Sequence, residues 1–213
     1  MRLGSFGLFA GRRLAILVLL VSASVAQATT YNVTINSPVL SGSPAVLVFD
    51  FVDGGLPNNT VTLSALVSNG IQGPVFKDGN ITGTGPWTFS DAGGSFFNEL
   101  QIPFGPMGSA VTFSFTTSDN APAGGFPDAF SFFILGTDLI TPLITTNDPT
   151  GANALFVYSI GVGSQGLSVY SPEQTGFSFR VDPVRSVPEP ATLLLLAAGL
   201  AAWSARRRLA RSQ

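Results

Sequence analysis

Acidic side chains are the residues of this sequence that could do chemistry. The chain contains no histidine and no cysteine, which excludes a Ser-His-Asp triad, a cysteine nucleophile and the usual zinc sites. A pair of carboxyl groups, as in glycoside hydrolysis, remains. Glu99 is its strongest candidate, because burial in the apolar segment 96–102 would raise its pKa. Glu99 could instead face solvent or pair with Lys77 or Arg180, as most acids do, so we assign no catalytic residue and expect no enzyme activity.

Oxygen-bearing side chains in turns also suit calcium, which prefers hard oxygen ligands. Asp50 and Asp53 with Asn58 and Asn59 form one candidate set, and Asp119 and Asn120 with Asp128 form another. The sequence contains no EF-hand loop. Aspartate and asparagine in turns more often bond the nearby backbone, so the expectation is no cofactor, with calcium, bound through Asp50 and Asp53, as the alternative.

Three aromatic residues are candidates for contacts with a glycan, whose ring C–H groups stack on exposed aromatic faces. They are Trp87, Tyr158 and Tyr170. The alternative for Trp87 is a place in the core, because large aromatic rings contribute most when buried.

The elements that would position these groups are strands. Apolar and polar residues alternate with the period of a strand that has one buried face in the segments 31–35, 61–65, 112–116 and 177–179. Ala45–Val52 and 129–135 are denser apolar runs, which predict central strands covered on both sides. Further strands are expected at 86–89, 96–102, 139–145, 154–160 and 167–170.

Turns rich in glycine separate these segments, among them Asp53-Gly54-Gly55 and Gly93-Gly94. About ten short strands with such punctuation predict an all-β fold, a single antiparallel β-sandwich of the jelly-roll type. We place this domain at residues 29–182, with a linker at 183–186.

The N-terminus has the pattern of a secretory signal peptide over residues 1–28. Arg12 and Arg13 precede an apolar run at 14–21, and Ala26 and Ala28 form an A-x-A cleavage site. We expect cleavage after Ala28; the alternative is an uncleaved N-terminal anchor.

The C-terminal segment 187–209 combines a short motif, an apolar run and a basic end. The motif is Val187, Pro188, Glu189 and Pro190, and the basic end is Arg206, Arg207 and Arg208. Residues 191–205 carry no charge and are rich in the helix formers leucine and alanine. A membrane-spanning helix is expected there, and the arginines place its C-terminal end in the cytoplasm.

This arrangement resembles the PEP-CTERM sorting tail of exported bacterial proteins. The resemblance implies processing by exosortase, a membrane-embedded protease or transpeptidase, with a cut near Pro188–Pro190. It also implies a Gram-negative bacterium that produces exopolysaccharide. The segments Phe96-Phe97-Asn98-Glu99 and Asp148-Pro149-Thr150-Gly151 are similar to small uncharacterised PEP-CTERM surface proteins, a resemblance that implies no activity.

The net charge of the domain limits the classes of partner that it can bind. Between Thr29 and Val187 there are three basic residues and eleven acidic ones, a net charge of −8. Such a domain repels phosphate backbones, which excludes nucleic acid. The expected partners are exosortase, the general export machinery and, before processing, the membrane. We expect a structural or adhesive protein of the cell surface or extracellular matrix; the alternatives are a module that binds exopolysaccharide with or without calcium, and a glycan-acting enzyme with paired acids.

Overall fold

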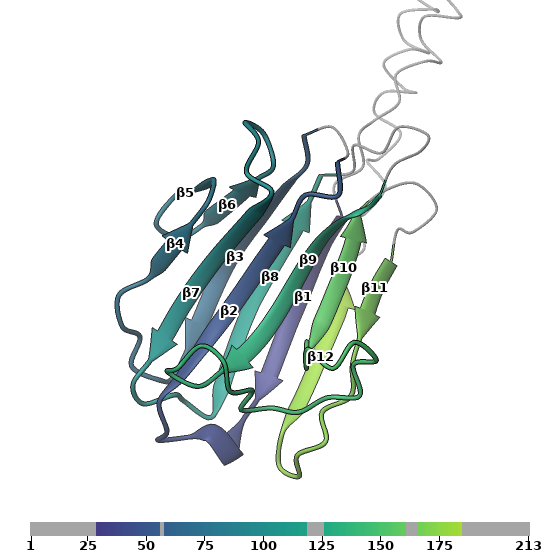
Figure 1. The fold of residues 1–213 in the computed structure, drawn as a ribbon. Coiled ribbons are helices and arrows are strands. Elements are labelled where there is room, and N and C mark those ends of the chain that lie inside the picture. The colour runs from purple at the N-terminus through teal and green to yellow at the C-terminus, as the bar shows by residue number, and fades with distance from the viewer. Residues whose placement is uncertain (1–28, 56–57, 119–125, 161–165, 185–213) are drawn as a thin grey trace, which may run out of the picture. The chain divides into compact units, whose positions relative to one another are not determined.

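Two six-stranded β-sheets face each other in the computed structural model of the chain (Figure 1), which describes residues 29–55, 58–118, 126–160 and 166–184. Sheet A has the order β12 (Ser178–Pro183), β1 (Thr29–Asn36), β8 (Ala110–Thr117), β3 (Thr60–Ser68), β6 (Trp87–Ser90) and β5 (Ile81–Thr82). Sheet B has the order β11 (Gly166–Val169), β10 (Phe156–Ile160), β9 (Asp128–Leu135), β2 (Ala45–Val52), β7 (Phe97–Phe104) and β4 (Phe76–Asp78). A short 3-10 turn, η1 (Pro38–Leu40), connects β1 to β2.

The strand pairing is nested, as in a long hairpin folded across two sheets. Strand β1 pairs with β8, β2 with β7, and β3 with β6, all antiparallel. Strand β8 also pairs with β3, which joins the β1–β8 pair and the β3–β6 pair into one sheet, sheet A. Strands β9, β10 and β11 then extend sheet B beyond β2. This nesting confirms the predicted jelly-roll-like β-sandwich.

Phenylalanine rings fill the space between the sheets. Phe49 of β2 stacks on Phe132 of β9 with ring centroids 4.8 Å apart. Phe113 of β8, in the opposite sheet, meets both rings edge-on at 5.2 Å. Phe115 stacks on Phe156 of β10 at 5.0 Å. Such contacts across the sheets let a domain without disulfides hold a packed core.

The outward face of sheet A is a surface of hydroxyl groups. One row of threonines crosses five neighbouring strands: Thr30, Thr116, Thr62, Thr88 and Thr82. Thr30 and Thr116 share a hydrogen bond of 2.8 Å between their hydroxyl groups. Ser64 and Ser114, in the next row, share one of 2.9 Å. The predicted alternation therefore places apolar residues inside and hydroxyl residues outside.

Two sequence expectations about the strands are wrong. No strand forms at 139–145, because Asp138 builds a turn there: its carboxylate accepts hydrogen bonds from the N–H groups of Ile140 and Thr141. The alternation predicted for 61–65 ends early, because the register against β8 shifts between Ser64 and Val67. Ala65 sits in this bulge at φ 52° and is exposed instead of buried.

The apolar runs predicted as central strands do lie in the middle of sheet B. Strand β2 pairs with β7 on one side and β9 on the other. Val46 and Val48, which point outward, are nevertheless buried. Within the described part of the chain, no helix is long and apolar enough to cross a membrane, and residues 191–205 lie outside that part.

Candidate functional site

Three carboxylates meet at one end of the sandwich. Asp53 directly follows β2, Asp91 directly follows β6, and Asp128 is the first residue of β9. One carboxylate oxygen from each lies within 4.8 Å of the other two. Asp128 is fully buried and Asp91 is 5% exposed, whereas Asp53 is half-buried. We call this group the aspartate cluster.

Asn59 ties two of these carboxylates together. Its side-chain amide donates to Asp128 Oδ2 at 2.7 Å, and its backbone N–H donates to Asp91 Oδ2 at 2.9 Å. The Gly54 N–H donates to Asp128 Oδ1 at 2.7 Å. A Cβ on Gly54 would lie 2.2 Å from the Pro127 carbonyl oxygen, so only glycine lets the backbone come this close. The turn after β2 is thus built to reach Asp128.

One buried oxygen of the aspartate cluster lacks a hydrogen-bond donor among the described residues. Asp91 Oδ1 is buried and has no hydrogen-bond partner among the described residues. Burial raises the pKa of the Asp91 carboxyl, and the nearby charges of Asp128 and Asp53 raise it further, although the Asn59 N–H lowers it. The Thr117 hydroxyl, at the end of β8, is also buried without a partner among these residues.

No basic side chain neutralises the aspartate cluster within the described ranges. Those ranges contain two basic residues, Lys77 and Arg180. Lys77 Nζ donates to the Gly83 carbonyl at 2.9 Å, and Arg180 forms an ion pair of 2.7 Å with Asp182. The donors to the cluster are therefore neutral N–H groups.

Asp50 lies elsewhere, on the outward face of sheet B. It stands opposite Glu99 in the register of β2 and β7. Burial raises the pKa of Asp50 to about 7, and the charge of Glu99 and a hydrogen bond with it contribute. Glu99 also accepts a hydrogen bond from the Gln101 side chain. Asp50 and Asp53 therefore belong to two different sites, which corrects their assignment to one metal set.

This pairing bears on one interpretation of Glu99, an ion pair with Lys77 or Arg180. The Glu99 carboxylate lies beside the carboxyl group of Asp50. Lys77 instead bonds the Gly83 carbonyl, and Arg180 pairs with Asp182. The charge of each carboxyl group disfavours ionisation of the other, which adds to the effect of burial on the pKa of Asp50.

Two of the three candidate glycan residues are part of the core. Trp87 is 6% exposed and Tyr158 is 5% exposed. The Tyr158 ring packs against the Tyr31 ring, with centroids 5.4 Å apart. Tyr170, directly after β11, is half-exposed. Trp87 and Tyr158 are thus almost fully buried, and Tyr170 alone forms no platform.

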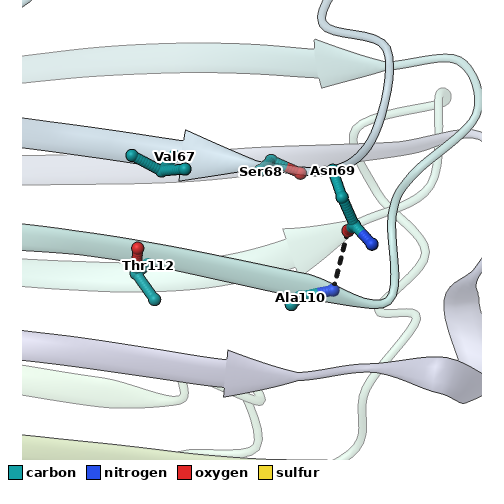
Figure 2. A pocket seen from close by; sticks show the side chains of 5 residues that line it. All are labelled: Val67, Ser68, Asn69, Ala110 and Thr112. Carbon is teal, nitrogen blue, oxygen red and sulfur yellow. Dashed lines mark hydrogen bonds between the residues drawn. The ribbon is translucent and has the colours of Figure 1, made fainter.

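Shallow hollows flank the bulge of β3. Figure 2 shows one of about 250 Å³ lined by Val67, Ser68, Asn69, Ala110 and Thr112. There the Asn69 side-chain oxygen accepts from the Ala110 N–H at 3.0 Å. A second hollow, also about 250 Å³, lies on the other side of the bulge along Ser64–Leu66 and Gly85–Trp87. Neither lining includes a charged side chain.

Several predicted residues lie outside the described ranges. They are the signal-peptide residues Ala26 and Ala28, the alternative calcium ligands Asp119 and Asn120, the motif Val187–Pro190 and the arginines Arg206–Arg208. The signal peptide, the linker, the membrane helix and the domain bounds stay predictions.

Comparison with known proteins identifies the C-terminal segment. Residues 186–208 match the model of the PEP-CTERM protein-sorting motif. The chain therefore carries a PEP-CTERM sorting signal, as the residues of its tail predicted. The motif implies export, anchoring in the membrane before cleavage, and processing by exosortase. No curated protein and no solved structure matches the chain.

Proposed function

We propose that this protein is a structural or adhesive component of the cell surface or extracellular matrix of a Gram-negative bacterium, and that it is not an enzyme. The sorting motif at residues 186–208 is the observation that carries the proposal, because it directs the domain outside the cell. The domain itself is a cysteine-free sandwich with a phenylalanine core and one hydroxyl-rich face.

The ends of the chain act in sequence during delivery. The signal peptide directs export and is removed after Ala28. Residues 191–205 then hold the chain in the membrane, with Arg206–Arg208 on the cytoplasmic side. Exosortase cuts near Pro188–Pro190 and frees the sandwich from its anchor.

Exosortase processing can be tested by changing the motif. We expect Pro188→Ala and Glu189→Ala to leave an unprocessed form in the membrane fraction, because the protease would no longer recognise its site. Immunoblotting of membrane and extracellular fractions measures this. A Val184→Ala variant, changed before the segment that matches the sorting motif, should mature normally. Normal maturation of the Pro188 and Glu189 variants would contradict the proposal.

Binding of exopolysaccharide is the second candidate function. The hydroxyl rows on the outward face of sheet A favour it, because hydroxyl groups in register can exchange hydrogen bonds with sugars. The burial of Trp87 and Tyr158 weighs against it, because no aromatic platform accompanies these hydroxyl groups.

A further inference from the structure

We propose that the aspartate cluster, Asp53, Asp91 and Asp128, binds a calcium ion. This inference does not depend on the proposed function, since it concerns the end of the sandwich and not its sorting. Three carboxylate oxygens converge there within 4.8 Å of one another, and each comes from a different turn or strand end.

The unused oxygen of Asp91 is the second observation. Asp91 is 5% exposed, and its Oδ2 accepts from Asn59 while its Oδ1 has no protein partner in the described ranges. A buried carboxylate oxygen without a partner is costly, because it has lost its water and gained nothing in return. A cation among the three carboxylates would satisfy this oxygen and offset the repulsion between the three charges.

The ligand chemistry points to calcium among the common cations. All candidate ligands are hard oxygens, and the chain has no histidine or cysteine to attract zinc. Magnesium requires near-ideal octahedral geometry and keeps most of its water, whereas calcium accepts several carboxylates in irregular arrangements and completes its shell with water. Extracellular calcium modules bind with dissociation constants of about 0.1–1 mM, which suits an exported protein.

Calcium at this position would fasten the two sheets together. Asp53 follows β2 and Asp128 begins β9, both strands of sheet B, and Asp91 follows β6 of sheet A. Asn59, which bonds both Asp91 and Asp128, directly precedes β3 of sheet A. The ion would therefore cross-link the two sheets, which disulfides cannot do in a chain without cysteine.

The test is thermal unfolding of the full-length chain, purified in mild detergent, followed by circular dichroism at pH 8. We compare 5 mM CaCl2 with 5 mM MgCl2, so that ionic strength is equal. Because calcium would bind only the folded state, we expect CaCl2 to raise the melting temperature by about 5 °C. An equal shift with MgCl2, or no shift with CaCl2, would overturn the calcium site.

The variant Asp91→Asn tests whether the calcium ion binds at the aspartate cluster. The amide keeps an oxygen for the Asn59 N–H and offers its NH2 group to the neighbouring carboxylates, so the variant should be at least as stable as the wild type without calcium. We expect its calcium shift to disappear. Asp78→Asn, which removes an exposed carboxylate of β4, is the matched control and should keep the full shift. An Asp91→Asn variant that responds to calcium as the wild type does would overturn the proposal, as would loss of the response in Asp78→Asn.

Discussion

Asp50 keeps its proton close to neutral pH because it is buried on the outward face of sheet B beside Glu99. Its pKa is about 7 in the folded protein, against an ordinary value of 3.8. Between these values the folded chain binds more protons than the unfolded chain. The free energy of unfolding therefore falls as the pH rises from about 4 to about 7, as far as Asp50 determines it.

Asp50→Asn should remove this loss. The amide resembles the protonated acid and cannot ionise, so we expect the variant to unfold at about the same urea concentration as the wild type at pH 4. At pH 8 its free energy of unfolding should exceed that of the wild type by about 4 kcal/mol. Glu173→Gln, which removes an exposed carboxylate, should keep the wild-type pH dependence. An Asp50→Asn variant that loses stability with pH like the wild type would contradict the assignment.

At the residue scale, the sequence identified the types of group but not their partners. Asp53 and Asp128 were recognised as candidate calcium ligands, in two different sets. Asp91 was missed, although it resembles Asp53: each follows a strand and precedes a glycine pair, Gly93-Gly94 and Gly54-Gly55. Only the nested strand pairing brings these turns to the same end of the sandwich, and pairing between distant strands cannot be deduced from local patterns.

At the scale of elements, β6 is a short strand held by two inward rings, Trp87 and Phe89. It pairs with β3 through four residues and carries β5 on its other side. Asp91 follows it by one residue, so the packing of this strand also positions the aspartate cluster.

Trp87→Ala should therefore destabilise the domain by about 3–5 kcal/mol, because it leaves a large cavity in the core. Tyr170→Ala, at a half-exposed ring, should change the free energy of unfolding by less than about 1 kcal/mol. Urea unfolding measures both values. Affinity electrophoresis against the strain's exopolysaccharide provides the counter-test, since a Trp87→Ala variant that folds normally and loses retention would make this ring a glycan contact.

Periodicity predicted most strands, because the alternation of apolar and polar residues directly reflects a sheet with one buried face. It failed where side chains of turns override it. The Asp138 carboxylate accepts hydrogen bonds from two backbone N–H groups and from the Thr141 hydroxyl. These bonds form a turn in a segment whose apolar composition is typical of a strand. The two-residue strand β5 and the three-residue strand β4 were missed because such short segments carry no measurable period.

At the scale of the whole molecule, the two outward faces differ in chemistry. Sheet A presents hydroxyl rows, whereas sheet B carries the Asp50–Glu99 pair. The segment 29–187 has a net charge of −8. A charge of this size favours solubility after release from the membrane and opposes contact with anionic surfaces. These properties suit a domain that is delivered outside the cell and remains there.

The most direct test of this account is the intact mass of the protein released by the producing cells. We predict a chain that begins at Thr29 and ends within Val187–Pro190, because the signal peptidase removes residues 1–28 and exosortase removes the helix and the arginines. A released protein that still contains residues 191–213 would contradict sorting by exosortase.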